Sequence, residues 1–313
     1  MRSHFATSSL VRLKNNIART KTSALAQDYY EVSFPKFAFM CGRYVTISKV
    51  KTIEKRFNVF APEPVQYIPN TNISHGNIAP VITNEKPNEL QFFQFGFTPS
   101  WATKNMYIVN ARAEGDHNKE NDPKYVGALG IISKPMFRSS IRSKRCLIPA
   151  DAFIEGPEKE RLNKPYLIYK RDGDRPFAFA GIWDNWVNRE TGEFISSFAI
   201  ITTVSNSITH KINHHRSPII LPREVESAWI DSSLSLSEVT ELLQPFPGEE
   251  LNAYPISIDI KKPTSNGLHL LEPTGERIIK EHDYIIYEDI RLEGMGMTTA
   301  RKRKNEGEQG LLF

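Results

Sequence analysis

Aromatic and β-branched residues gather in short segments that are separated by polar and turn-forming residues. This pattern is typical of β-strands that bury one face. It predicts strands over residues 90–98, 107–111, 146–154, 166–169, 177–183 and 194–203. Residues 61–80 are rich in Pro and Asn and are predicted to form a loop.

Helical spacing is rarer. Val50, Ile53 and Phe57 recur at intervals of three and four residues with Lys and Glu between them, which predicts a short helix through about Asn58. Ser48 is the predicted N-cap, because its hydroxyl can accept a hydrogen bond from a free amide of the first turn.

Two further helices are predicted at residues 223–230 and 237–243, the second capped by Ser235 or Ser237. Strands outnumber helices and do not alternate with them regularly. We therefore expect an α+β fold with a mainly antiparallel β-sheet core and a few packed helices.

Composition excludes several classes of protein. Hydrophobic residues make up 40% and charged residues 24% of the 313 residues, as in ordinary globular chains, and no apolar run is long enough for a membrane-spanning helix. The net charge of +4 permits a polyanionic partner without proving one. Only Cys41 and Cys146 are present, which argues against a disulfide framework and for a reducing compartment. No His or Cys spacing typical of a metal site and no Gly-rich phosphate loop is found, so no cofactor is expected.

Both ends of the chain differ in composition from the middle. Residues 1–39 contain basic residues, Ser, Thr and Ala, and the first acidic residue is Asp28. A transit peptide and a wrongly assigned start codon both fit this leader, and we favour the start codon. We expect a main domain at residues 40–275 and a C-terminal extension at residues 276–313, which ends in a flexible, basic tail.

Cys41 follows Met40 directly, so a chain started at Met40 and relieved of that methionine would begin with cysteine. Its amine and thiol, with reference pKa values of about 8 and 8.5, are both partly nucleophilic near neutral pH. Such a 1,2-aminothiol can form an imine with an aldehyde and close to a thiazolidine. A small buried thiol is the alternative interpretation of Cys41, and the tetrapeptide alone does not choose between them.

An ordered set of motifs distinguishes the two interpretations of Cys41 and favours the nucleophile. The set consists of Cys41-Gly42-Arg43, Phe95-Gly96-Phe97-Thr98-Pro99-Ser100-Trp101, Asn110-Ala111-Arg112-Ala113-Glu114, Arg145-Cys146-Leu147-Ile148-Pro149-Ala150-Asp151-Ala152-Phe153-Ile154-Glu155, Phe179-Ala180-Gly181-Ile182-Trp183 and His214-His215-Arg216-Ser217-Pro218. Over residues 40–273 this combination resembles the SOS-response-associated peptidase (SRAP) family of abasic-site processing proteins. The resemblance implies a protein that captures the aldehyde of an abasic site in single-stranded DNA as a thiazolidine, in the response to DNA damage.

The resemblance also implies roles for individual residues. Cys41 matches the crosslinking cysteine, and Asn110 matches the residue that positions the sugar and the nucleophile. Glu155 matches the acid/base glutamate, for which partial burial would raise the pKa toward a useful range. His214 matches the histidine that assists ring opening as a proton donor.

DNA contacts are implied for a second group of residues. Arg43, Arg112 and Arg216 match arginines that hold DNA phosphates, a task for which guanidinium groups are suited. Trp101 and Phe97 are candidates for stacking on bases, with a core position as the alternative for Trp101. Trp183 and Cys146 are expected to be buried structural residues.

Some positions depart from the family pattern. Gly156 follows Glu155 where tryptophan is usual, Ser217 replaces a frequent methionine, and Asn213 replaces an isoleucine. A charged insert around residues 116–124 lengthens the segment after Asn110. These departures bear on the preferred DNA structure, whereas the four expected catalytic residues are all present.

The leader conflicts with the crosslinking chemistry, because an internal Cys41 has no free amine. Translation from Met40, trimming by another protease and self-cleavage would each resolve the conflict. Self-cleavage connects to the alternative function, a thiol (auto)peptidase that uses Cys41 and His214. A third hypothesis is a non-catalytic accessory that binds single-stranded DNA, and the resemblance also leaves lyase-type activity open.

The last five residues, Gln309 to Phe313, resemble the Gln-x-x-Leu-Phe peptides with which bacterial proteins dock on the β sliding clamp. Gln309, Leu312 and Phe313 are the expected clamp contacts, because paired apolar side chains suit a hydrophobic groove. We accordingly expect a monomer in a bacterial cytoplasm, associated with the nucleoid and with no membrane partner.

Overall fold

The computed structural model describes residues 42–63 and 67–280. The predictions for the leader, for Cys41 and for the C-terminal tail with Gln309, Leu312 and Phe313 therefore lie outside the described residues. No helix in the part of the chain that the structure describes is long and apolar enough to cross a membrane.

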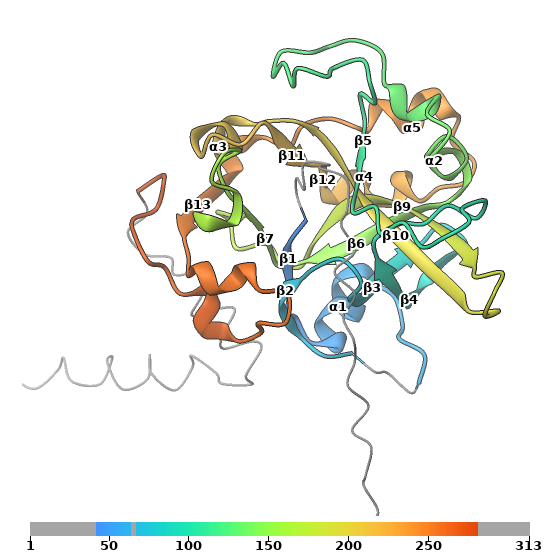
Figure 1. Ribbon diagram of the computed structural model, residues 1–313, viewed down its shortest axis with the longest axis horizontal. Coiled ribbons are helices and arrows are strands. Elements are labelled where there is room, and N and C mark those ends of the chain that lie inside the picture. The colour runs from blue at the N-terminus through green and yellow to red at the C-terminus, as the bar shows by residue number, and fades with distance from the viewer. Residues whose placement is uncertain (1–41, 64–66, 281–313) are drawn as a thin grey trace, which may run out of the picture. The chain divides into compact units, whose positions relative to one another are not determined.

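Two β-sheets form the framework (Figure 1). The smaller sheet has the order β13-β8-β7-β1-β2, with bounds Leu251–Pro255, Tyr166–Lys170, Ala152–Glu155, Tyr44–Thr46 and Asn70–Ile73. All of its pairings are antiparallel.

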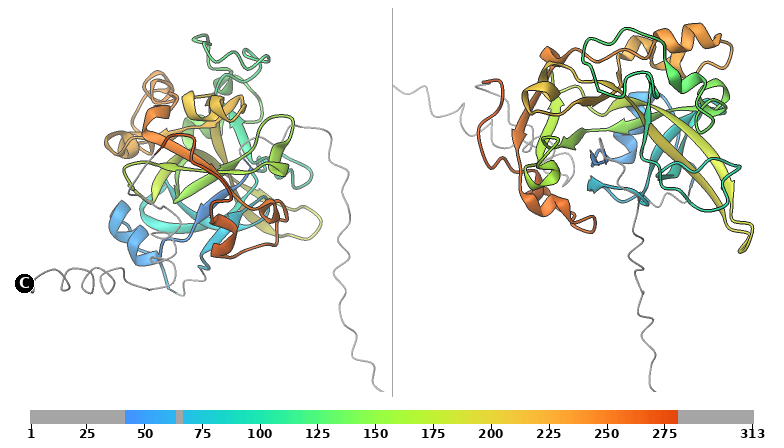
Figure 2. Two further views of the ribbon diagram at one scale, coloured as in Figure 1. Left: turned by 90° about the vertical axis from the view of Figure 1, so that its left-hand side faces the viewer. Right: turned by 45° about the horizontal axis from the view of Figure 1, so that its top comes forward.

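The larger sheet has the order β11-β10-β4-β3-β6-β9-β12. Its strands are β11 (Arg216–Pro218), β10 (Phe194–Val204), β4 (Lys86–Phe95), β3 (Ile78–Thr83), β6 (Arg145–Ala150), β9 (Phe177–Val187) and β12 (Ile220–Leu221). Because β9 also pairs with β10, the strands β10, β4, β3, β6 and β9 close into a ring. The hairpin tip between β9 and β10 projects from this ring (Figure 2).

The short strand β5 (Asn110–Arg112) pairs with β10 in parallel, as β4 does. The other ladders of this sheet are antiparallel. The fold is therefore α+β with a mainly antiparallel core, as predicted.

Five short α-helices flank the sheets of the described chain: α1 (Val50–Phe57), α2 (Ser140–Ser143), α3 (Ser207–Lys211), α4 (Arg223–Trp229) and α5 (Leu236–Glu241). The predicted helices correspond to α1, α4 and α5. Ser235 caps α5 in a reciprocal capping box with Glu238. The predicted cap of α1 is wrong, since Lys49 occupies that position and the Ser48 hydroxyl donates instead to Asp151 at 2.5 Å.

The predicted loop at residues 61–80 is wrong in part, because it contains β2 and the beginning of β3. The segment was predicted as a loop because Pro and Asn are rare in strands and common in turns. The fully buried Asn72 of β2 donates to the carbonyls of Ile260, Lys262 and Ser265 at 2.9 to 3.1 Å. A polar residue can thus occupy a buried strand when distant segments satisfy it.

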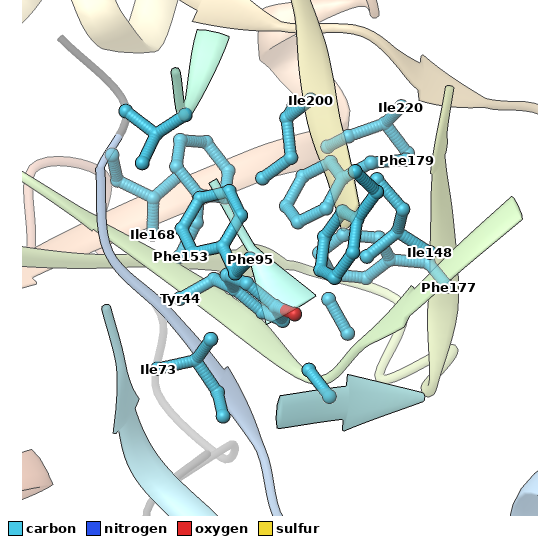
Figure 3. Close-up of a cluster of buried hydrophobic side chains, with 14 of the residues drawn as sticks. Tyr44, Ile73, Phe95, Ile148, Phe153, Ile168, Phe177, Phe179, Ile200 and Ile220 are labelled. Carbon is cyan, nitrogen blue, oxygen red and sulfur yellow. The ribbon is translucent and has the colours of Figure 1, made fainter. Parts of the chain in front are cut away.

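Apolar side chains from both sheets fill a shared core (Figure 3). Tyr44 of β1 meets Phe95 of β4 edge-on at 5.4 Å, and Phe153 of β7 meets Phe179 of β9 at 5.9 Å. Trp183, at 2% exposure, and Cys146, at 0%, are buried here as predicted. This packing fixes β1 against β7, which positions the site described next.

Candidate functional site

Glu155 and His214 form a buried pair between β7 and the loop before β11. Glu155 is the last residue of β7, and its Oε2 lies 3.4 Å from Nε2 of His214. The two residues are only 4% and 5% exposed. A carboxyl and an imidazole this close and this buried can exchange a proton with each other or with a bound molecule.

The other ring nitrogen of His214 fixes the position of its proton. Nδ1 lies 2.8 Å from the carbonyl oxygen of Gly156. A carbonyl oxygen only accepts hydrogen bonds, so Nδ1 donates this bond, and Nε2 is the ring nitrogen that faces Glu155. The His214 amide also donates to the Thr209 carbonyl at 2.9 Å, which ties the histidine to α3.

Gly156 allows a close backbone approach at this point. A Cβ at position 156 would lie 1.8 Å from the carbonyl oxygen of Arg161. Glycine is therefore required by packing, and the tryptophan that the family pattern places here would not fit this backbone. The same compact turn presents the carbonyl that orients His214.

The chain enters the domain beside this pair. Tyr44 faces Phe153 in the antiparallel ladder of β1 and β7, and the Ile154 amide donates to the Arg43 carbonyl at 3.0 Å. One further step along this register sets Gly42 opposite Glu155.

Gly42 also lies near the beginning of β5. A Cβ at Gly42 would lie 4.0 Å from Cγ2 of Val109, the residue before Asn110. Asn110 is half-buried, and its Oδ1 has no hydrogen-bond partner among the residues that the structure describes. Gly42 thus lies near the strand that carries Asn110.

The guanidinium group of Arg43 forms hydrogen bonds with other parts of the chain. Its Nη1 donates to Asn72 at 2.7 Å and to the Ile260 carbonyl at 2.9 Å, and its Nη2 donates to the Lys261 carbonyl at 3.0 Å. Burial lowers the pKa of Arg43 to about 10. These bonds connect β1 to the segment around residue 260, and they compete with the phosphate contact expected from the sequence.

Arg216 is buried beside the site. Its side chain has no exposed surface, and its Nη2 donates to Glu114 Oε2 at 2.8 Å and to the Thr202 carbonyl at 2.9 Å. Its Nε and Nη1 have no hydrogen-bond partner among the described residues. The phosphate contact expected from the sequence stays a prediction for this residue, whose side chain is closed to solvent in the described conformation.

Arg112 lies two residues from Asn110 and is half-buried. Its Nη2 donates to the carbonyl of Asn118 and, at 3.0 Å, to the side chain of Asn121. Burial lowers the pKa of Arg112, and the neighbouring charge of Arg216 lowers it further. The charged insert at residues 116–124 thus folds against a residue that was expected to contact DNA.

The two aromatic candidates have opposite environments. Trp101 is 56% exposed, in a turn held by hydrogen bonds from Ser100 to Asp184 and from Trp186 to Ala102. Phe97 is 0% exposed and packs against Phe137 at 5.9 Å. Base stacking by Phe97 is contradicted by this burial, and Trp101 alone of the two presents a face to solvent.

Two contributors were missed in the sequence. Glu114 belongs to the Asn-Ala-Arg-Ala-Glu motif, but the sequence predicted no role for it, although it is 2% exposed and binds Arg216. Its signal was a carboxylate two residues after Arg112 in that motif. The Gly156 carbonyl gave no signal, because a backbone acceptor appears only once the chain is folded.

The described residues contain no group of three or more His, Cys, Asp or Glu side chains that could hold a metal ion. The site brings together a carboxyl and an imidazole group, which are side chains capable of proton transfer, while Gly42 lies near the strand that carries Asn110.

Comparison with known proteins gives one family. Residues 40–263 match the model of the family described as SOS response associated peptidase (SRAP). The abasic site processing protein YoqW of Bacillus subtilis is 32% identical over 240 residues, which cover 74% of this chain and 99% of that protein. The abasic site processing protein YoaM of the same organism is 31% identical over 240 residues, 74% of this chain and 98% of that protein. A crystal structure of a protein from Bacteroides thetaiotaomicron is 30% identical, with a TM-score of 0.63, and covers 75% of this chain and all of that chain.

Proposed function

The chain belongs to the SOS response associated peptidase (SRAP) family, and on this premise we propose that it processes abasic sites in single-stranded DNA by forming a covalent adduct through Cys41. The active form of the protein begins at Cys41 in this proposal. Its relatives YoqW and YoaM carry the name abasic site processing protein.

The proposed reaction is a condensation that loses one water molecule. The α-amine of Cys41 attacks the aldehyde carbon of the ring-opened sugar, and the carbinolamine loses water to give an imine. The thiol then adds across the C=N bond, so that sulfur bonds to carbon and a proton reaches nitrogen. The product is a five-membered thiazolidine that links protein and DNA, and neither an oxidant nor a metal takes part.

The observation that carries the proposal is the position of Gly42. The residue next to Cys41 comes two residues before β1, which pairs with β7, the strand that ends at Glu155, and a Cβ at this residue would lie 4.0 Å from Val109, which precedes Asn110. Carbinolamine dehydration needs a proton donor, and ring opening needs proton transfer to the sugar oxygen. Glu155 and His214, 3.4 Å apart, are suited to these transfers. Asn110, with its free buried Oδ1 among the described residues, is suited to position the sugar.

DNA binding in this proposal involves Trp101 and the two arginines Arg112 and Arg216. Trp101 is exposed for stacking on a base, and aromatic stacking tolerates any sequence. The two arginines carry N–H groups without hydrogen-bond partners among the described residues. Such groups are suited to phosphate oxygens.

Intact-mass spectrometry tests the proposal on protein expressed from its own gene, before and after incubation with single-stranded DNA that contains one abasic site. The expected result is a chain that begins at Cys41 and gains the mass of one strand with the loss of one water. DNA whose abasic aldehyde has been reduced to the alcohol should give no adduct. Cys41→Ser should abolish the adduct, and Cys146→Ala is the matched control, because Cys146 is buried in the core.

A wild-type chain that begins at Cys41 and yields no adduct would contradict the proposed function. Cleavage of the Met40–Cys41 bond by the purified full-length chain, lost on Cys41→Ser, would instead favour the thiol peptidase.

Docking on the β sliding clamp is the second part of the proposal. It is supported by the C-terminal sequence Gln309-Gly310-Leu311-Leu312-Phe313, whose apolar pair suits a hydrophobic groove. Deleting residues 309–313 should abolish clamp binding in surface plasmon resonance and leave DNA adduct formation unchanged. Equal clamp affinity of both chains would overturn this part.

A further inference from the structure

Glu114 forms a buried bridge between two neighbouring strands. Its Oε2 accepts from Arg216 of β11 at 2.8 Å, and its Oε1 accepts from the Thr203 hydroxyl of β10, also at 2.8 Å. Glu114 and Thr203 are 2% and 4% exposed, so water does not substitute for either bond. The carboxylate is therefore held at both oxygens, and it holds Arg216 by one nitrogen.

The register of β10 brings Arg112 close to Arg216, the arginine that Glu114 holds. Thr202 of β10 faces Arg112 of β5 on one side and Pro218 of β11 on the other. Arg216 lies two residues before Pro218 and donates to both oxygens of Thr202, at 2.9 and 3.2 Å. Two positive charges thus lie close together, and the charge of Glu114 offsets their repulsion.

The bonding leaves part of each guanidinium group unused. Within the described chain, Nε of Arg112 and both Nε and Nη1 of Arg216 are buried without a hydrogen-bond partner. A buried N–H group without an acceptor is costly, and it is rare in proteins except where a ligand supplies the acceptor. An anion with several oxygen atoms, such as a phosphate, has the chemistry that these donors lack.

We propose that Glu114 is a positioning residue that holds Arg216 beside Arg112, so that their N–H groups without partners, which are buried in the described conformation, meet a phosphate of the DNA backbone when DNA opens the site. The inference rests on the proposed function, since that function supplies the DNA. It assigns Glu114 no contact with DNA; the carboxylate acts through the two arginines.

The sign of the effect on DNA affinity tests this role. Glu114→Gln removes one negative charge, so a general electrostatic effect would strengthen binding to the polyanion. Loss of positioning would weaken it. We expect the half-saturating concentration of unmodified single-stranded DNA, measured by fluorescence anisotropy, to rise about tenfold. The slope of log affinity against log salt concentration should become shallower by about 0.7, the value for one lost phosphate contact on a single strand.

Two further variants separate positioning from folding. Thr203→Val removes the hydroxyl bond to Glu114 and keeps the charge and the shape, so it should raise the half-saturating concentration by about threefold even if Glu114→Gln folds poorly. Glu226→Gln is the matched control. Glu226 is a buried carboxylate paired with Arg56 between α4 and α1, so this change alters the net charge equally and should leave the salt slope unchanged.

Adduct formation is measured on the same preparations. The limiting rate at saturating abasic DNA should stay within about twofold of wild type in Glu114→Gln, because a positioning residue for the backbone contact acts on binding. Unchanged affinity and salt slope in both Glu114→Gln and Thr203→Val would overturn the inference alone. A wild-type chain beginning at Cys41 without any adduct would overturn the proposed function, and the inference with it.

Discussion

Two buried arginine–glutamate pairs in this molecule show how the same chemistry serves different ends. Arg56 and Glu226 connect α1 and α4 through two hydrogen bonds of 3.0 and 2.7 Å, so both carboxylate oxygens bind the guanidinium group. Glu114 divides its oxygens between Arg216 and Thr203. Arg216 consequently keeps two nitrogens without a partner among the described residues, and Arg56 keeps one.

The surroundings of the two pairs differ as well. Arg56 lies over the Phe57 ring at 4.5 Å, and the nearby charge of Arg223 also acts on Glu226. Arg216 and Arg112 lie next to each other, near the loop that carries His214. The pair that uses both carboxylate oxygens on one guanidinium group connects two helices, whereas the pair at Glu114 leaves Arg216 with two nitrogens that the proposal assigns to a DNA phosphate. The following variants test this difference.

The largest effect is expected from Glu155→Gln. Gln cannot donate and recover a proton as a carboxyl group does, so the limiting rate of adduct formation should fall by about 100-fold or more. Glu226→Gln, which also removes a buried carboxylate, should keep the wild-type rate. Quenched time points resolved by denaturing gel electrophoresis give both rates, and equal rates for the two variants would contradict an acid/base role for Glu155.

Stability should respond equally at the two pairs. Glu114→Ala and Glu226→Ala each leave a buried guanidinium without its counter-ion, so each should lower the free energy of unfolding by about 3–5 kcal/mol. Urea denaturation monitored by tryptophan fluorescence measures the loss. A much smaller loss for Glu114→Ala than for Glu226→Ala would indicate that Thr202 and water replace Glu114.

The two aromatic candidates provide a second contrast of binding and packing. Trp101→Ala should weaken binding to single-stranded DNA by about 1–3 kcal/mol and leave the unfolding midpoint unchanged, because the side chain is 56% exposed. Phe97→Ala should do the reverse and destabilise the core by about 3–5 kcal/mol. Anisotropy titrations and thermal unfolding of both variants check the pair. An unchanged DNA affinity in Trp101→Ala would remove Trp101 from the binding surface.

The smallest effect is expected at the insert. Asn121→Ala removes one acceptor from Nη2 of Arg112, so this guanidinium becomes more available to phosphate. DNA affinity should rise by about two- to threefold, within the range of a single exposed hydrogen bond. Asn188→Ala in the β9–β10 turn is the control, since its side chain accepts from Glu190 and Thr191 and from no arginine. Weaker binding of Asn121→Ala would mean that the insert supports Arg112 instead of competing for it.

Local sequence patterns were sufficient to predict the fold class and the family. Aromatic and β-branched segments predicted strands, and six such segments contain or overlap β4 to β10. The ordered motifs indicated the SRAP family, to which the chain belongs. Both signals are local, because a strand pattern and a motif are properties of neighbouring residues along the chain.

The contacts between side chains from distant segments could be known only from the folded chain. The pairing of β1 with β7 brings Tyr44 opposite Phe153, two residues before Glu155, and β10 brings Arg112 together with Arg216. Phe97 is buried and Trp101 is exposed, although both belong to one motif. Partners more than 80 residues apart also converted Asn72 and Glu114 into buried, hydrogen-bonded groups. A local pattern holds no information on such partners, because burial and hydrogen bonding are set by strand pairing across the folded chain.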